Sequence, residues 1–332
     1  MDPSHAERTA TAGDRDRTPT RRQFLAAGGL AALGALAGCG GQNTPHGWVE
    51  ASVPGSGALY DVAMTDAGPH AVGEAGRIVA RTDAEWRGVV ADGPNGNQTT
   101  LTAVDVTDDA RRLWAAGSSG ALVQYDTASG SLVDFSAPLG KTSSWEAVAV
   151  TGRTGSERVH LVNGSGELLS GRVGPDSVQW GQVSKPTGGE SATALDFAGG
   201  TGFLTDTGGG IYRTTGDDWT AVGPGLDDTV HDLSATERGL ATVVTDGGTV
   251  RLFTGYNWLD LASTESALHA VDSWEAHGVA AGVDGVVYEL DRNGWEQQDS
   301  PTSATIHGVT LGRDTYSDVA VGANNTVMER FA

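Results

Sequence analysis

The sequence predicts an all-β fold, a seven-bladed β-propeller of four-stranded blades whose ring is closed by an N-terminal strand. Three observations lead to this prediction. One phrase recurs along the chain at a nearly constant spacing, each repeat holds four short strand-like segments, and the segment that the last repeat lacks occurs near the other end of the 332-residue chain. Repeats of about 40 residues with four strands each are typical of propeller blades.

The repeated phrase is a glycine, a short β-branched run, a polar turn and a tryptophan. It reads GRIVARTDAEW (76–86), GGIYRTTGDDW (209–219), GTVRLFTGYNW (248–258) and GVVYELDRNGW (285–295). Aligning the repeats on the glycine before the β-branched run gives spacings from 37 to 46 residues. The aligned positions are Gly76, Gly120, Gly166, Gly210, Gly248 and Gly285, with Asn325 in the equivalent place of the seventh repeat.

Each repeat accounts for four strands. The first strands begin at Leu59, Leu101, Trp145, Ala192, Thr229, Ala267 and Thr305. A second apolar run ends in a tight turn, where Gly, Asn and Asp supply the positive φ that hairpins need. The third strand follows, and the fourth begins at Trp86, Trp180, Trp219, Trp258 and Trp295, whereas the second repeat has LVDF (132–135) there. We expect these tryptophans to pack against neighbouring sheets as core, since each buries up to roughly 250 Å².

The seventh repeat ends soon after its third strand and contains no tryptophan. The missing phrase, GWVEASVP, stands at 47–54. We therefore predict that residues 48–54 form the outer strand of the last blade, and that the propeller spans 48–332. Closing the ring in this way covers sheet edges that an open array would expose.

The N-terminus carries an export and lipidation pattern. Arg21 and Arg22 form a twin-arginine pair, followed by an apolar run over 24–38. That run of about 15 residues is too short for a membrane span, which needs about 20. It ends in LAGC (36–39), which resembles a lipobox with cleavage before Cys39 and lipid on its sulfur. We expect a signal peptide over 1–38, a lipid-anchored tether over 39–47 and a location on the extracellular face of the cell membrane. The alternative is a soluble secreted protein with an incidental cysteine.

The charge pattern limits the classes of molecule that we expect the protein to bind. Acidic residues outnumber basic ones by 42 to 21, and only Lys141 and Lys185 are lysines. Such an acidic, lysine-poor composition resembles proteins of salt-loving archaea, although an ordinary acidic secreted protein would also fit. No basic patch is visible, so we expect no nucleic-acid partner. The single cysteine excludes an internal disulfide.

The repeat phrase resembles propellers of the photosystem II stability and assembly factor type and, more loosely, the Asp-box repeats of sialidases. The resemblance covers 59–332 and implies an extracytoplasmic scaffold that holds partner proteins. It carries over no catalytic residue, because the Asp-box pattern S/T-x-D-x-G-x-x-W is degenerate in every repeat; RTDAEW (81–86) has the acid but not the glycine.

The sequence also lacks familiar catalytic motifs. We find no GxSxG, HExxH, CxxC, GxGxxG or phosphate loop. No cluster of three arginines accompanies a tyrosine–acid pair, as a sialidase would require. Segments 126–130 and 291–294 resemble calcium loops only faintly, and we predict hairpin turns there. We therefore expect a non-enzymatic protein-binding scaffold without a cofactor. A carbohydrate-binding or sialidase-like propeller is the alternative, and a quinoprotein-like dehydrogenase is a weaker one.

A set of polar residues recurs at the second position of the first-strand motif, directly after an apolar residue. Around the ring this position holds Tyr60, Thr102, Glu146, Thr193, His231, His269 and His307. We expect these side chains to line the mouth of the central channel, either as polar lining or as a metal or anion site. Sheets pack about 10 Å apart, so we do not expect the three histidines to share one ion, although a pair with Glu146 stays open.

Three glycosylation sequons begin at Asn97, Asn163 and Asn324. Asn163 and the residue after Asn324 also fall in predicted tight turns. Asn97 lies in a loop between the first two blades and is the favoured acceptor.

Overall fold

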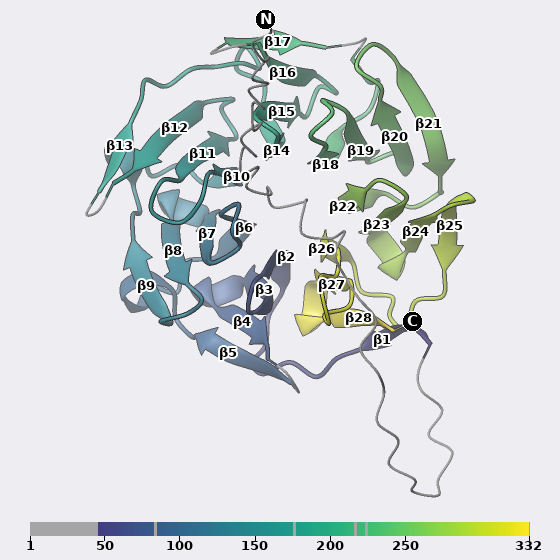
Figure 1. Cartoon of the computed structure of the whole chain (residues 1–332), viewed down its shortest axis with the longest axis horizontal. Helices are drawn as coiled ribbons and strands as arrows, with labels where there is room; N and C mark the ends of the chain where they lie inside the picture. Colours follow the sequence, from purple (N-terminus) through teal and green to yellow (C-terminus); the bar gives the residue numbers. More distant parts are fainter. Residues whose placement is uncertain (1–45, 83–84, 175–176, 216–217, 223–224, 332) are drawn as a thin grey trace, which may run out of the picture.

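Each repeat folds as one antiparallel four-stranded sheet, and seven such sheets surround a central channel (Figure 1). The computed structural model describes residues 46–331, except 83–84, 175–176, 216–217 and 223–224. The seven-bladed propeller predicted from the repeats is confirmed. In the described part of the chain, no helix is long and apolar enough to cross a membrane.

The strands of each blade run outward from the channel in chain order, except in blade 7. Blade 1 comprises β2 (Leu59–Thr65), β3 (Gly68–Gly73), β4 (Ile78–Arg81) and β5 (Trp86–Val90). Blade 2 comprises β6 (Leu101–Val106), β7 (Arg112–Gly117), β8 (Leu122–Asp126) and β9 (Ser131–Asp134). Blade 3 comprises β10 (Trp145–Thr151), β11 (Arg158–Asn163), β12 (Leu168–Val173) and β13 (Val178–Trp180). Blade 4 comprises β14 (Ala192–Ala198), β15 (Thr201–Asp206), β16 (Ile211–Thr215) and β17 (Asp218–Ala221).

The remaining blades follow the same plan. Blade 5 comprises β18 (Val230–Ala235), β19 (Ala241–Thr245), β20 (Thr249–Phe253) and β21 (Trp258–Ser263). Blade 6 comprises β22 (Leu268–Trp274), β23 (His277–Gly282), β24 (Val287–Asp291) and β25 (Gly294–Gln298). Blade 7 comprises β26 (Ile306–Thr310), β27 (Val319–Gly322), β28 (Val327–Phe331) and β1 (Gly47–Glu50). Short 3-10 turns connect strands at η2 (Glu74–Gly76), η3 (Pro94–Gly96), η4 (Ser118–Gly120), η5 (Pro138–Gly140), η6 (Val283–Gly285) and η7 (Ala323–Asn325).

The residue that ends the second hairpin turn adopts a left-handed backbone in every blade. In blade 4 this residue is Gly209, with φ of 75°, and not Gly210 as the sequence alignment predicted. Gly209 stands two positions before Ile211, the first residue of β16, as Gly76 does before Ile78. In blade 7 Asn325 takes the same role with φ of 65°, which asparagine tolerates better than most residues.

The predicted starts of the outer strands hold within one residue, except in blade 3. There Trp180 ends β13 instead of beginning it. Trp180 pairs with Gly171, and a Cβ on Gly171 would approach the indole to 2.5 Å. The ring therefore fills space that a glycine leaves empty. The pairing with β12 continues irregularly after it, since Gly181 donates to Ser170 and Ser184 forms a bridge with Leu168.

The core consists of apolar clusters between neighbouring blades. Trp114 and Trp145 are completely buried, and Trp48, Trp86 and Trp295 are at most 9% exposed. Trp219 and Trp258, at the starts of the outer strands of blades 4 and 5, are half-buried and each packs against one of these interblade clusters. They serve as core, as predicted.

Blade 7 is completed from the two ends of the chain. Strand β1 pairs with β28 in antiparallel register from Gly47↔Phe331 to Glu50↔Met328, so β1 is the outer strand of this sheet (Figure 1). The predicted closure by an N-terminal strand is confirmed, but the strand begins one residue earlier than Trp48 and ends at Glu50 instead of Pro54.

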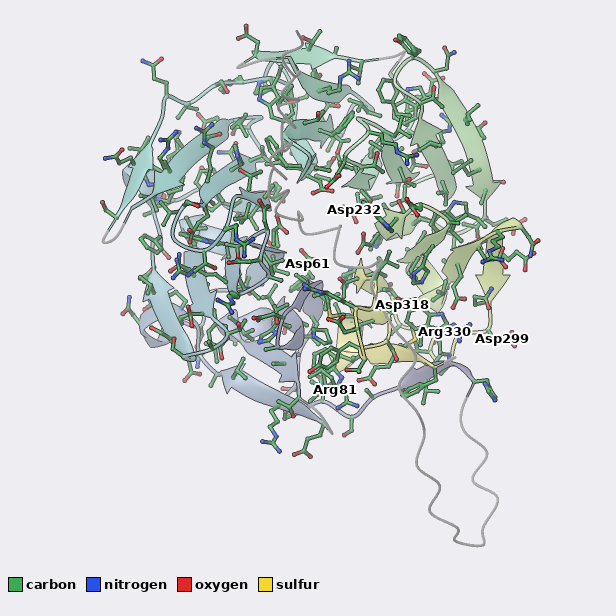
Figure 2. All side chains as sticks on the ribbon, in the orientation of Figure 1. Asp61, Arg81, Asp232, Asp299, Asp318 and Arg330 are labelled. Carbon is green, nitrogen blue, oxygen red and sulfur yellow. The ribbon has the colours of Figure 1, made fainter. Side chains whose placement is uncertain are left out.

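A recurring contact joins blade 7 to both neighbours. The indole N–H of Trp48 donates to Glu289 Oε1 of blade 6 at 2.8 Å, and that of Trp86 donates to Glu329 Oε1 of blade 7 at 2.7 Å. Arg330 and Arg81, which Figure 2 labels, occupy equivalent positions of their third strands and contact the same two glutamates. These Trp–Glu–Arg contacts were not predicted from the sequence.

Candidate functional site

The second residues of the inner strands line one end of the central channel, as predicted. The channel holds a cavity of about 180 Å³ whose walls include all seven of these residues. Four of them form a continuous row of rings across blades 1, 7, 6 and 5. The ring centroids of Tyr60 and His307 lie 5.4 Å apart, those of His307 and His269 6.2 Å, and those of His269 and His231 4.6 Å.

These distances are shorter than the sheet separation of about 10 Å assumed above. Blades of a propeller converge on the central axis, so their innermost residues approach more closely than the sheets do farther out. The rings of His269 and His307 are nearly parallel, with an interplanar angle of 5°. Neighbouring histidines are therefore in direct contact.

An acidic residue that the sequence analysis missed completes this cluster. His231 Nε2 lies 3.1 Å from Asp246 Oδ1, and Asp246 begins the turn between β19 and β20 of the same blade. One ligand atom from each of His231, Asp246 and His269 can be chosen so that all lie within 4.8 Å of one another. A related contact occurs in blade 1, where the hydroxyl of Tyr60 donates to Glu74 in the equivalent turn at 3.5 Å.

The signal for Asp246 was present in the repeat alignment. The start of an inner strand and the turn after the second strand lie at the same end of a blade, because the two strands are antiparallel. A polar side chain at the start of that turn can therefore meet the second residue of the inner strand.

Burial lowers the pKa of two of the channel histidines, His269 and His307. Burial, followed by the neighbouring imidazoles of His231 and His307, lowers the pKa of His269 to about 4. Burial also lowers the pKa of His307. Both imidazoles are thus neutral at neutral pH, with a ring nitrogen able to accept a hydrogen bond or a metal.

Glu146 lies elsewhere on the channel wall. It belongs to β10 of blade 3, separated from the histidine-bearing strands by β14. Burial raises the pKa of its carboxyl. Among the described residues, the carboxylate that approaches His231 and His269 is that of Asp246.

Deeper in the channel, five aspartates join neighbouring blades (Figure 2 labels Asp61 and Asp232). Each occupies the third or fifth position of an inner strand and accepts a backbone N–H from the next blade at 2.7–3.0 Å. The pairs are Asp61–Val104, Asp105–Val150, Asp196–Ala235, Asp232–Val271 and Asp272–Leu311. A cluster of buried acids can resemble a ligand site. Here the carboxylates connect neighbouring blades and hold the ring together.

Among these aspartates, Asp232 has the carboxyl pKa that burial in the channel raises most clearly. Burial raises its pKa well above the usual value, the like charge of Asp61 adds to the rise, and the amides of Val271 and Leu233 oppose it. The channel interior is therefore a hydrogen-bonded structural element.

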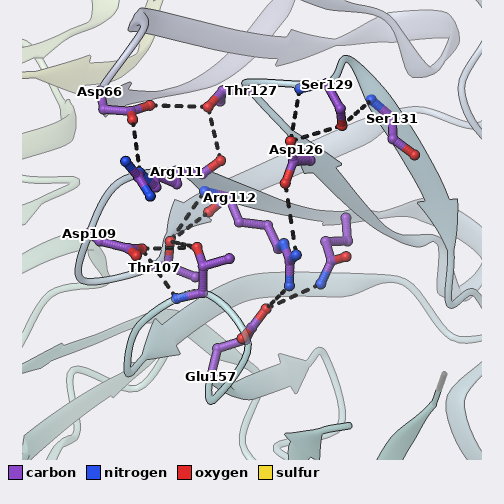
Figure 3. A network of polar contacts seen from close by, with 12 residues as sticks. Asp66, Thr107, Asp109, Arg111, Arg112, Asp126, Thr127, Ser129, Ser131 and Glu157 are labelled. Atoms are coloured by element: carbon purple, nitrogen blue, oxygen red, sulfur yellow. Dashed lines mark hydrogen bonds and ion pairs between the residues drawn. The ribbon is translucent and has the colours of Figure 1, made fainter. Parts of the chain in front are cut away.

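A second polar network joins blades 1, 2 and 3 at the opposite ends of the inner strands (Figure 3). Asp66, after β2, accepts a hydrogen bond from the hydroxyl of Thr127 at 3.0 Å. Arg112 of β7 contacts the buried Glu157 at 2.6 Å. Asp126 Oδ1 accepts both the backbone N–H and the hydroxyl of Ser129, at 2.9 and 2.8 Å. The carboxylate thus stabilises the β8–β9 hairpin turn that was predicted for 126–130.

The three sequon asparagines differ in accessibility. Asn97 and Asn324 are exposed. Asn163 is 1% exposed, and its side chain donates to Glu167 and accepts the backbone N–H groups of Ser165 and Glu167. A glycan on Asn163 would disrupt this turn, whereas Asn97 stays a candidate acceptor. Arg21, Arg22 and Cys39 lie outside the described residues.

Comparison with known proteins supports the propeller fold. The chain matches no protein-family model and no curated protein. Among solved structures, YCF48 bound to D1 peptide is similar with a TM-score of 0.68 and 11% identity, covering 87% of this chain and 96% of that chain. YCF48 from Cyanidioschyzon merolae has a TM-score of 0.64 and 14% identity, covering 86% and 98%. The WD40 repeats of RRP9 have a TM-score of 0.70 and 11% identity, covering 85% and 96%. At these identities the similarity is one of fold.

Proposed function

We propose that this chain is an exported, lipid-anchored propeller that binds another protein on the extracellular face of the membrane and catalyses no reaction. The twin-arginine pair and Cys39 support export and anchoring. The fold supports protein binding, because one similar structure, YCF48, is bound to a peptide. The acidic, lysine-poor composition supports a working environment of high salt.

The proposal that this chain binds another protein rests mainly on three exposed apolar side chains of blade 5. Tyr256 is 87% exposed, and Leu259 and Leu261 on the edge strand β21 are 50% and 38% exposed. Leu259 and Leu261 stand two residues apart on the outer edge of the blade 5 sheet, and Tyr256 precedes that strand. Exposed apolar side chains on an edge strand favour association with a partner. We name Tyr256, Leu259 and Leu261 the blade 5 patch.

The channel supports the same conclusion. Its cavity of about 180 Å³ is smaller than the usual small-molecule pocket of about 300–1,000 Å³. Its inner carboxylates are occupied by interblade hydrogen bonds. The channel therefore offers little room for a small-molecule ligand of ordinary size, which favours recognition of a protein partner.

Crosslinking in intact cells followed by mass spectrometry tests this proposal. A specific partner should be crosslinked to the wild type and be lost when Leu259→Asp and Leu261→Asp are combined. Val133→Asp is the matched control, because Val133 is 41% exposed on β9, the outer strand of blade 2. Equal recovery of the partner with all three proteins would contradict a role for the blade 5 patch.

A glycan array and a panel of glycosidase substrates test the alternative. Tight glycan binding or turnover by the wild type would replace the scaffold proposal with a carbohydrate-active one. If the wild type neither binds a glycan tightly nor turns over a glycosidase substrate, and a protein partner is crosslinked, the scaffold proposal is supported.

A further inference from the structure

Three potential metal ligands meet at the channel mouth between blades 5 and 6. His231 comes from β18, His269 from β22 and Asp246 from the turn after β19. Their ligand atoms all lie within 4.8 Å of one another, and His231 Nε2 and Asp246 Oδ1 are already 3.1 Å apart. A tetrahedral zinc ion with bonds of about 2.0–2.1 Å separates its ligand atoms by about 3.3 Å. Small side-chain rotations would therefore bring the three groups to bonding positions.

We propose that His231, His269 and Asp246 bind a divalent cation of the zinc class. Two imidazole nitrogens and one carboxylate oxygen suit zinc and its neighbours in the first transition row. Calcium and magnesium prefer oxygen ligands throughout and would gain little from the two imidazoles. Three protein ligands leave a further coordination position, which water or a partner's side chain could fill.

The backbone around these ligands is held in place before a metal binds. Asp232, next to His231, accepts the N–H of Val271 on β22 at 2.8 Å, which fixes the two histidine-bearing strands relative to each other. The N–H of Asp246 donates to Thr229 O at 3.0 Å, and that of Gly247 donates to Asp228 at 2.6 Å. The turn is thus tied to the segment before β18. A preorganised site loses less conformational entropy on binding.

His307 lies beside the site but outside the ligand set. Its ring stacks on His269 with centroids 6.2 Å apart, and it does not belong to the group of ligand atoms within 4.8 Å. We therefore assign it the role of orienting the His269 ring. Bound metal would connect blades 5 and 6 at the channel mouth and should stabilise their junction.

Titration of the full-length chain with zinc tests this site. The chain carries Cys39→Ser to remove the thiol as a competing ligand, is treated with a chelator, and is measured by calorimetry in a buffer based on nitrate, since chloride competes for zinc. We expect one zinc ion per chain and a higher melting temperature with zinc, since a ligand that binds only the folded state stabilises it. His231→Ala, His269→Ala and Asp246→Asn should each weaken binding by at least about tenfold, a loss already typical of outer-shell substitutions.

A second histidine–aspartate pair provides the matched control. His277 Nε2 lies 2.9 Å from Asp318 Oδ2, but in the described part of the chain this pair belongs to no group of three ligands. His277→Gln should therefore leave zinc affinity unchanged. Circular dichroism without metal verifies that each variant is folded. The site is refuted if the wild type binds no zinc, or if folded variants of the three ligands bind as tightly as His277→Gln. Loss of binding in His307→Ala with retention in Asp246→Asn would refute the assigned ligands.

Discussion

Removal of the N-terminal strand should destabilise the whole ring, although that strand is short. A chain that starts at Ala58 lacks β1 and the segment up to Gly57. Edge strand β28 then loses its partner from Gly47 to Glu50, and Asn325 loses the carbonyl of Val53, to which it donates at 2.9 Å. We expect this chain to aggregate or to melt far below one that starts at Gly40.

The contribution of one side chain can be worked out from the structure. Trp48 is 6% exposed and belongs to one apolar cluster with Met328 and with residues of blade 6, including Ala270 and Val279. Truncation of a buried tryptophan to alanine costs about 3–5 kcal/mol, a large share of a total stability of about 5–15 kcal/mol. The propeller spans 47–331, and at about 2.1 cal/mol/K per residue its unfolding entropy is about 0.6 kcal/mol/K. A loss of about 3–5 kcal/mol should therefore lower the melting temperature of Trp48→Ala by about 5–8 °C relative to the wild type.

Thermal unfolding followed by circular dichroism in one high-salt buffer measures both effects. Leu259→Ala is the control, because its half-exposed side chain makes a change within about 0.5 kcal/mol the expectation. Equal melting temperatures for the chains that start at Gly40 and Ala58 would refute ring closure as a source of stability. A melting temperature of Trp48→Ala equal to that of Leu259→Ala would refute the packing argument.

Three further predictions concern the anchor, the channel and the response to pH. Cys39→Ser should move the protein from the membrane fraction to the medium or a salt wash, and unchanged membrane association would contradict the anchor. Asp105→Ala leaves the buried N–H groups of Val106 and Val150 without their acceptor; at about 1–3 kcal/mol each it should cost about 2–6 kcal/mol in urea unfolding, and a cost below 1 kcal/mol would contradict the interblade role. Burial, with a smaller contribution from Arg158, lowers the pKa of His160 to about 3, whereas the unfolded value is about 6.5. The unfolded state therefore binds the proton first, and stability falls as the pH drops below about 6.5. From pH 7 to pH 5 the wild type should lose about 2 kcal/mol more than His160→Phe, and parallel stability curves would contradict this.

The repeat pattern predicted the architecture because blade formation is local. A hairpin needs a turn residue with positive φ and two flanking apolar runs, and both are visible within one repeat. The closing strand was also predictable, since only one segment of the chain matched the phrase missing from repeat seven. Trp180 was misplaced at the start of its strand because its packing depends on Gly171, which lies across the sheet.

The interblade contacts were not predictable from one repeat alone. The bond from Val104 to Asp61 joins two inner strands that are 43 residues apart in sequence, and the contact from Trp86 to Glu329 spans 243 residues. Nothing in the local pattern specifies which polar side chains of different blades face each other. The distance between the channel histidines was overestimated for the same reason, because the sheet spacing holds for parallel layers and not at the axis of a ring.

The distribution of these contacts explains how a ring of divergent repeats is held closed. Aspartate bridges join five of the seven junctions between inner strands, including the junctions from blade 1 to blade 2 and from blade 6 to blade 7. At the junction from blade 7 to blade 1 the inner strand of blade 7 has Gly308 at the third position, where a Cβ would approach the backbone of Asp61 to 2.7 Å. The two inner strands therefore pack too closely for a larger side chain.

Stabilisation at that junction comes from farther out on the blades. Glu329 accepts hydrogen bonds from Trp86 and Arg81 at 2.7 and 2.6 Å, and Asn325 accepts one from Arg77 at 2.7 Å. These contacts join residues near the C-terminus to blade 1. They add to the covalent connection between the two blades, which runs through residues 51–58 from β1 to β2. The ring is thus closed by polar contacts at its periphery in addition to the strand pairing of β1.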